Sequence, residues 1–296
     1  MDTVLVTGGL GGAGSWIVER FAERGTHVVC LDQRRPESGR ENVSFYAVDL
    51  TEQGETWELV HEEDPDAVVH FAAIPDPLSD PGTRVFENNV ESTYNVLVAA
   101  GRVGAEVAWA SSESAYGFPF ADPTPLPDYL PVDESHPMRP EDPYGTSKVT
   151  GEEIAGMVTR RYGVPVTSIR PSWIQYPGRY FVGDVRENTD LDDPGRSGNF
   201  WSYVDVRDVA SMVEAALDAD REGHEAFLAH AAENYVGAPT ADLVEAGFGD
   251  LPEECALSGE ESAFTTAKAR DLLGWEPSHD WRTAEDEDVP GPSFVG

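Results

Sequence analysis

The stretch Thr7-Gly8-Gly9-Leu10-Gly11-Gly12-Ala13-Gly14 decides the fold of this 296-residue chain. It follows a short β-rich run at residues 3–6 and opens a segment, residues 12–24, in which apolar residues recur at helical spacing. Glycines in such a turn permit a tight bend, a close approach of the backbone to a pyrophosphate, and close packing of helix on strand. The stretch therefore predicts a dinucleotide-binding turn, with phosphate contacts from Gly8, Gly11, Gly12 and Gly14.

An acidic residue, Asp32, ends the next predicted strand, residues 27–31. A carboxylate at this place can accept hydrogen bonds from a ribose 2′-hydroxyl and would repel a 2′-phosphate, so NAD is the predicted cofactor. Arg34 and Arg35 follow closely, and either could bind a 2′-phosphate. The sequence therefore leaves NADP open as an alternative.

Strand-like and helix-like segments alternate along most of the chain. The apolar patterns predict strands at residues 3–6, 27–31, 43–48, 67–71, 107–110 and 164–169, and helices at 12–24, 52–61, 83–100, 144–162 and 204–217. Strands that alternate with helices form parallel sheets covered on both faces. The predicted fold class is α/β, a doubly wound parallel sheet of the Rossmann type with a small C-terminal substrate lobe.

Two domains are expected. Residues 1–170 with 201–232 would form the dinucleotide-binding domain, and 171–200 with 233–296 the small substrate-binding lobe. Eight of the 22 prolines fall between residues 117 and 143, which excludes a regular helix or central strand there and predicts an ordered loop. Short helices are predicted at 240–246 and 265–273, and the acidic, Pro- and Gly-containing end, residues 285–296, is expected to fray.

The composition is strongly acidic, with 55 acidic against 20 basic residues and a net charge of -35. Such a surface repels phosphate backbones, so nucleic-acid binding is disfavoured. Lys148 and Lys268 are the only lysines. Because molar salt screens charge repulsion, this composition resembles that of cytosolic proteins from extreme halophiles. Neither a signal peptide nor a membrane-length apolar run is visible, two cysteines give no disulfide framework, and no metal site is predicted, so a cytoplasmic location is expected.

Tyr144 and Lys148 lie four residues apart and share one face of a predicted helix. A free tyrosine has a pKa of about 10, and a neighbouring ammonium would stabilise the phenolate and lower that pKa. The pair could then take a proton from a substrate hydroxyl while hydride leaves the same carbon. Together with the glycine turn, the pair predicts a nicotinamide-dependent oxidoreductase.

Across about residues 2–275 the chain resembles the extended short-chain dehydrogenases/reductases, the superfamily of NAD-dependent sugar epimerases, dehydratases and dehydrogenases. The resemblance rests on Thr7-Gly8-x-x-Gly11-x-x-Gly14, Asp32, Val48-Asp49-Leu50, His70-Phe71-Ala72-Ala73, Asn89, Ser111-Ser112-x-x-x-Tyr116-Gly117, Tyr144-x-x-x-Lys148, Arg170-Pro171 and residues 203–210.

The resemblance implies roles for the matching residues. Ser112 would hydrogen-bond the reacting oxygen, Tyr144 would be the general base or acid, and Lys148 would bind the nicotinamide ribose and tune the tyrosine. Cofactor contacts would come from Arg34, Asp49, Leu50, Phe71, Ala72, Ala73, Asn89 and Pro171, in addition to the glycine turn and Asp32. The family also implies a homodimer that pairs through the helices at 83–100 and 144–162.

Two departures from the family pattern bear on the substrate. Only about 30 residues separate Pro171 from Tyr203, where sugar-nucleotide enzymes usually carry a longer insert. Glu113 is followed by Ser114 instead of completing the Asp-Glu pair of the dehydratases. The chain thus looks more like the free-sugar 1-dehydrogenases of halophilic archaea, which oxidise an aldose or uronate to a lactone. Substrate contacts are expected from Asp76, Ser112, Glu113, Ser114, Trp173, Gln175 and Arg179.

Three hypotheses follow. The first is NAD(P)-dependent oxidation of a small free sugar at C1, with an inward-pointing Arg179 favouring a sugar acid or sugar phosphate. The alternative is a nucleotide-sugar epimerase or dehydratase that shows no net redox change. A non-catalytic dinucleotide sensor is the third, and it is disfavoured because Tyr144 and Lys148 are both present.

Overall fold

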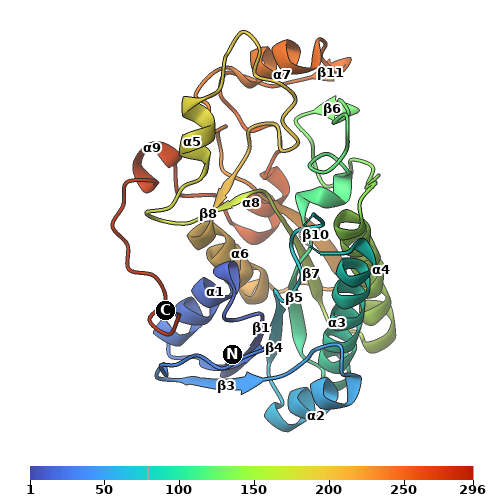
Figure 1. Ribbon diagram of the computed structural model, residues 1–296. Helices are drawn as coiled ribbons and strands as arrows, with labels where there is room; N and C mark the ends of the chain where they lie inside the picture. Colours follow the sequence, from blue (N-terminus) through green and yellow to red (C-terminus); the bar gives the residue numbers. More distant parts are fainter. Residues whose placement is uncertain (79, 296) are drawn as a thin grey trace.

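Seven parallel strands form the central sheet of the computed structural model, which describes residues 1–78 and 80–295. Their order is β10-β7-β5-β4-β1-β2-β3 (Figure 1). Their bounds are Thr3–Thr7 (β1), His27–Asp32 (β2), Val43–Ala47 (β3), Ala67–His70 (β4), Glu106–Ala110 (β5), Val166–Pro171 (β7) and His224–Ala229 (β10). Because β1 pairs with both β2 and β4, the strand order reverses there, which is where open α/β sheets bind ligands. The predicted doubly wound fold is confirmed.

Helices cover both faces of this sheet. One hydrophobic cluster joins the sheet to α1 (Gly12–Glu23), α6 (Val206–Asp218) and α8 (Ala267–Leu273). A second joins the other face to α2 (Gln53–Glu63), α3 (Gly82–Val103) and α4 (Pro143–Tyr162). The central strands are apolar on both faces, as in β1, where Val4, Leu5 and Val6 are all buried.

Shorter elements gather beyond the carboxyl ends of the strands (Figure 1). They are η1 (Glu113–Tyr116), β6 (Tyr129–Leu130), β8 (Ile174–Gln175), α5 (Val182–Glu187), β9 (Val204–Asp205), α7 (Thr240–Phe248), β11 (Glu254–Cys255) and α9 (Trp281–Ala284). An aromatic-rich third cluster, which includes Tyr116, Phe200 and Phe264, joins all of them except β8 and β9, which pair with each other. The proline-rich segment 117–143 is irregular as predicted, apart from the two residues of β6 and Pro143, which opens α4.

The sequence did not predict β10. Its first residues, His224 and Glu225, are polar and half-buried, so the apolar run in this strand is too short to stand out. The strand lies at the edge of the sheet beside β7. It completes the seven-stranded sheet, and the chain leaves it at His230 on the carboxyl-end side.

The expectation that the chain end frays is wrong. Phe294 is buried and its ring lies 5.3 Å from that of Phe45 on β3. Figure 1 shows the chain end beside α1. A single aromatic residue among acidic, Pro and Gly neighbours thus anchors the segment in the first hydrophobic cluster.

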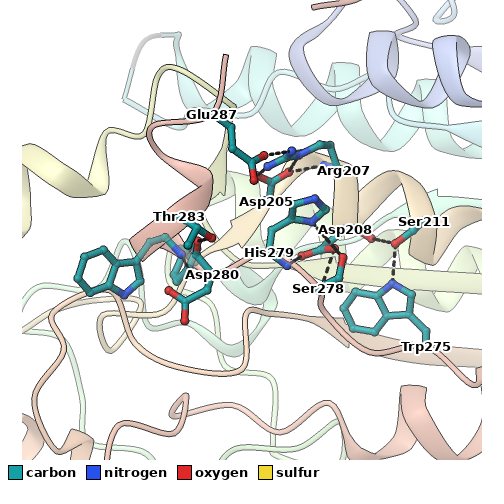
Figure 2. A network of polar contacts seen from close by, with 12 residues as sticks. Asp205, Arg207, Asp208, Ser211, Trp275, Ser278, His279, Asp280, Thr283 and Glu287 are labelled. Atoms are coloured by element: carbon teal, nitrogen blue, oxygen red, sulfur yellow. Dashed lines mark hydrogen bonds and ion pairs between the residues drawn. The ribbon is translucent and has the colours of Figure 1, made fainter. Parts of the chain in front are cut away.

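The acidic residues of the 203–210 motif also anchor the C-terminal segment (Figure 2). Asp208 accepts hydrogen bonds from the amide and hydroxyl of Ser278, and from the amide and Nδ1 of His279. Arg207 bridges Asp205 and Glu287. The Asp208 contact raises the pKa of His279 above its usual value. This motif, at the start of α6, therefore fixes residues 278–287 in place.

Candidate active site

The glycine turn is held where the strand order reverses. Gly8 has φ +68, and a Cβ built there would lie 2.6 Å from the amide nitrogen of Ala72. Only glycine fits such a place without strain. A Cβ at Gly14 would collide with the Gly8 carbonyl oxygen, and one at Gly12 with the hydroxyl of Tyr176. Gly11 stands just before α1 without a side-chain cap, so the first amides of this helix remain available to an anion.

Asp32 lies beside this turn and supports it directly. Its carboxylate accepts hydrogen bonds from the amides of Leu10 at 3.0 Å and Gln33 at 2.8 Å. Arg34 is exposed, and the guanidinium of Arg35 lies 6.0 Å from the ring centre of Tyr46. Of these charged groups, the carboxylate is the one tied to the glycine turn.

The other predicted cofactor residues border the same edge of the sheet. The Asn89 side chain accepts from the Ile74 amide at 2.8 Å and donates to the Ile74 carbonyl at 3.0 Å, which fastens the loop that carries Phe71, Ala72 and Ala73. Leu50 is buried in the second cluster, whereas Asp49 is exposed and accepts from the amide and hydroxyl of Thr51.

Ser112, Tyr144 and Lys148 converge at the carboxyl end of β5. Asp142 caps α4 by accepting from the Gly145 amide at 2.8 Å, which puts Tyr144 in the first turn of that helix. The Lys148 Nζ donates to the Ala110 carbonyl at 2.7 Å and lies 5.3 Å from the ring centre of Tyr144. The Ser112 hydroxyl lies near the Tyr144 phenol, and both residues line the same cavity. The three side chains therefore meet as predicted.

The expected lowering of the tyrosine pKa is wrong for the protein alone. Burial raises the pKa of Tyr144 to about 12, and the polar contact with Ser112 opposes this only in part. Burial also lowers the pKa of Lys148 to about 7. The cause is the removal of both groups from water, which disfavours the charged form of each.

A cavity of about 620 Å³ opens above these residues. Ser112, Glu113, Ser114, Tyr144, Pro171 and Trp173 line it, as the sequence predicts. Phe120 also lines it and meets the Tyr144 ring edge-on at 6.2 Å. No arginine or lysine is among its lining residues within the described chain.

Three predicted substrate contacts do not line the cavity. Gln175 is fully buried, and its side chain donates to the Trp173 carbonyl at 3.2 Å and accepts from the Val182 amide. Arg179 is exposed, with its guanidinium 5.0 Å from the ring centre of Phe181. Asp76 accepts from the amide of Leu78 at 2.7 Å. The condition under which Arg179 would favour a sugar acid or sugar phosphate, an inward-pointing guanidinium, is not met in this structure.

The sequence missed several lining residues, namely Ser172, Tyr176, Asn199 and Tyr235. Ser172 and Tyr176 follow the Arg-Pro motif closely, and this position was a signal that could have found them. Asn199 and Tyr235 lie in segments without a recognisable pattern. In residues 1–78 and 80–295, no group of three His, Cys, Asp or Glu side chains could hold a metal ion. In the same residues, no helix is long and apolar enough to cross a membrane.

By fold and site together, the chain is a short-chain dehydrogenase/reductase of the extended type. The comparisons name its family more closely. The model of the NAD dependent epimerase/dehydratase family matches residues 4–229, so the chain belongs to this family.

The similar proteins include both an epimerase and a dehydrogenase. A UDP-glucose 4-epimerase of Streptococcus mutans is 27% identical over 320 residues, which cover 94% of this chain and 92% of that protein. A short-chain dehydrogenase/reductase superfamily protein from Agrobacterium tumefaciens with bound NAD is 23% identical, with a TM-score of 0.72 over 96% of this chain and 95% of that one. A glucuronic acid dehydrogenase from Chromohalobacter salexigens is 20% identical, with a TM-score of 0.67 over 98% and 90%. The last two show the fold alone.

Proposed function

We propose that this chain is an NAD-dependent oxidoreductase of sugar hydroxyls, and that it works as a nucleotide-sugar epimerase. The observation that carries the first part is the meeting of Ser112, Tyr144 and Lys148 at a 620 Å³ cavity beside a glycine turn. The second part rests on the relatives, because the chain aligns over almost its full length with UDP-glucose 4-epimerase. This ranking replaces free-sugar oxidation, which the sequence alone favours.

The residues of the glycine turn fit a dinucleotide. Gly8 and Gly14 leave no room for a side chain, and the uncapped start of α1 faces the place of a pyrophosphate. The Tyr176 hydroxyl beside Gly12 would donate to a phosphate oxygen there. Asp32 would accept from the adenosine ribose, next to Asp49 and Leu50, which favours NAD over NADP. Arg34 is exposed and would be the residue to engage a 2′-phosphate.

Tyr144 would take the proton of the substrate hydroxyl while Ser112 orients that oxygen. Bound NAD⁺ would supply the hydride acceptor and a positive charge beside the phenol. That charge would oppose the effect of burial on the tyrosine, since nearby positive charge favours the phenolate. Lys148 would hold the nicotinamide ribose from its buried place beneath Tyr144.

A second candidate is oxidation of a free aldose or uronate at C1. The cavity favours it because no lining residue in the described chain is a cation that would pair with the diphosphate of a nucleotide sugar. The exposed rings of Trp173 and Phe181 at the same cavity argue the other way, because aromatic faces stack on nucleobases. The two candidates therefore need a direct assay.

The test is an activity screen of the purified protein in high salt. UDP-galactose and UDP-glucose are supplied with NAD, and free D-glucose, D-xylose and D-glucuronate with NAD or NADP. The proposal expects interconversion of the two nucleotide sugars with no accumulation of NADH. Steady NADH formation from a free sugar would replace it with the second candidate. No turnover of any sugar by protein that binds NAD would overturn both.

The division into two lobes, the oligomeric state and the cellular environment of the protein are further proposals. We assign residues 1–170 with 201–232 to the cofactor domain and 171–200 with 233–296 to the substrate lobe. A homodimer would pair through α3 and α4, and light scattering in solution would test it. The net charge of -35 favours a halophilic cytoplasm, and unfolding in dilute and in molar KCl would test the salt requirement.

A further inference from the structure

Three polar side chains meet at one side of the cavity, and each follows the carboxyl end of a different strand. Glu113 follows β5 through Ser112, Ser172 follows β7, and His230 follows β10. These strands are neighbours in the sheet, so their ends lie side by side. Glu113 and Ser172 line the cavity, while His230 stacks on Phe264 with ring centres 4.3 Å apart. All three residues are at least 94% buried.

Ser172 lies close enough to Glu113 to lower its pKa in part, yet the cluster contains four buried polar atoms without a well-formed hydrogen bond. Glu113 Oε2, the Ser172 hydroxyl and both ring nitrogens of His230 form no hydrogen bond of normal geometry. The His230 Nε2 lies 3.9 Å from Glu113 Oε2, too far for a hydrogen bond. Because buried polar groups are nearly always satisfied in folded proteins, such a gathering indicates atoms that a ligand satisfies.

The chemistry of the cluster suits an uncharged hydroxyl. Burial raises the pKa of the Glu113 carboxyl well above its usual value and lowers that of His230 to about 3. The other titratable groups near Glu113 are Tyr144 and Tyr235, and burial raises the pKa of both to about 12. A neutral carboxyl both donates and accepts, which matches the hydrogen-bonding capacity of a sugar hydroxyl.

We propose that Glu113 binds a ring hydroxyl of the sugar next to the one that faces Tyr144, and that His230 is the positioning residue that holds the Glu113 carboxyl in place. The inference rests on the proposed function, because it takes the cavity to be a sugar site. It adds a requirement for the substrate that oxidation of a sugar hydroxyl does not impose by itself. The hydroxyl beside the reacting carbon must be present and uncharged, so a substrate with an anionic group at that place is rejected.

The test measures binding and turnover separately. Titration of NAD-loaded protein with UDP-glucose and D-glucose, followed by fluorescence of the cavity residue Trp173 against a Trp173→Phe blank, gives affinity without requiring turnover. Glu113→Ala should weaken binding of the sugar that the wild type accepts about 10- to 100-fold, with kcat reduced much less. Glu113→Gln should recover most of that loss, because an amide also donates and accepts. His230→Phe keeps the stacking on Phe264 and should weaken binding less than Glu113→Ala.

Deoxy sugars identify the hydroxyl. The 3-deoxy analogue, for reaction at C4, or the 2-deoxy analogue, for reaction at C1, lacks it and should bind equally well to the wild type and to Glu113→Ala, whereas the 6-deoxy analogue should still bind more weakly to the variant. Glu106→Gln is the matched control, since Glu106 begins the same strand β5 far from the cavity and burial raises its pKa to about 7. This control should bind sugar normally.

Each outcome separates the inference from the proposed function. Unchanged sugar affinity in folded Glu113→Ala, with turnover intact, overturns the inference alone. Equal losses for every deoxy analogue also overturn it, because they show a merely structural effect. Sugar binding to the wild type without turnover overturns the proposed function, while the affinities of the variants still decide the inference. If neither sugar binds to NAD-loaded wild type, both are overturned.

Discussion

Two regions of the candidate active site, the cofactor wall and the substrate wall, are built in opposite ways. The cofactor wall, made of the glycine turn 7–14, the loop 71–75 and Asn89, is closely packed, and its polar groups are tied to one another. The substrate wall, made of Glu113, Ser172 and His230, is more deeply buried, and Glu113 Oε2, the Ser172 hydroxyl and both His230 ring nitrogens form no hydrogen bond of normal geometry. The cofactor wall pairs its polar side chains and offers a ligand the uncapped main-chain amides at the start of α1. A wall with unmet hydrogen bonds suits a ligand particular to this chain.

The largest expected effect comes from damage to the cofactor wall. In Gly14→Ala, the added methyl group collides with the Gly8 carbonyl and opens the turn. We expect NAD affinity to fall more than about 100-fold, because backbone approach to the pyrophosphate depends on this turn. Isothermal titration with NAD measures it. Gly54→Ala in α2, where nothing lies within 4 Å, should bind NAD as the wild type does. Normal NAD binding by Gly14→Ala would contradict the assignment of this wall.

The next effect concerns Tyr144, the proposed proton acceptor. Tyr144→Phe removes the proton acceptor while leaving its surroundings in place, so kcat should fall about 10²- to 10⁴-fold with NAD affinity unchanged. The measurement is the initial rate with the sugar found in the activity screen. Tyr162→Phe, at the other end of α4, is the control and should retain full activity. A Tyr144→Phe protein that keeps its rate would exclude the phenol from catalysis.

A third effect concerns the buried ion pair between Arg170 and Glu152. Arg170 donates to both carboxylate oxygens of Glu152, at 2.8 and 2.6 Å, and both residues are buried. Arg170→Met leaves a buried carboxylate unpaired, so the free energy of unfolding should fall by about 3–5 kcal/mol. Urea unfolding in high salt measures this. Arg139→Met, which breaks the exposed pair with Asp128, should change the free energy of unfolding far less, because water and salt screen that pair. Similar losses for both variants would contradict the contrast between buried and exposed pairs.

The smallest effect lies outside both walls, at His279. Contact with Asp208 raises the folded-state pKa of His279 above its usual 6.5. The stabilisation is therefore fully present below about pH 6.5 and is lost as the pH rises through the raised value. The loss should stay within about 1 kcal/mol, the usual size for a partly exposed pair. Denaturation of the wild type and of His279→Gln at pH 5.5 and pH 8.5 measures it, and the variant should lack the part of the dependence that this pair contributes, while Glu106 and Lys148 titrate in both proteins. An identical pH dependence in the wild type and the variant would contradict the role of His279.

The same contrast explains what the sequence could predict. The glycine turn, Asp32, Ser112, Tyr144 and Lys148 lie at fixed spacings that local geometry demands, so pattern alone located them. The Glu113 and His230 side chains are 117 positions apart in the chain and meet only because β5, β7 and β10 are neighbours. Gln175 and Arg179 show the same limit, because their direction depends on how the irregular segment 171–200 folds. The prediction that Lys148 lowers the pKa of Tyr144 was wrong for a related reason. The four-residue spacing of the pair carries no information on how deeply the two side chains are buried.

The anchoring of Phe294 against Phe45 has a consequence for biosynthesis. The first hydrophobic cluster contains both Val4 and Phe294, so it cannot close until almost the entire chain has left the ribosome. Cores that depend on such distant partners assemble late and expose apolar surface meanwhile. A nascent chain cut short before this aromatic residue would leave one flank of β3 uncovered, and such fragments should be favoured clients of chaperones.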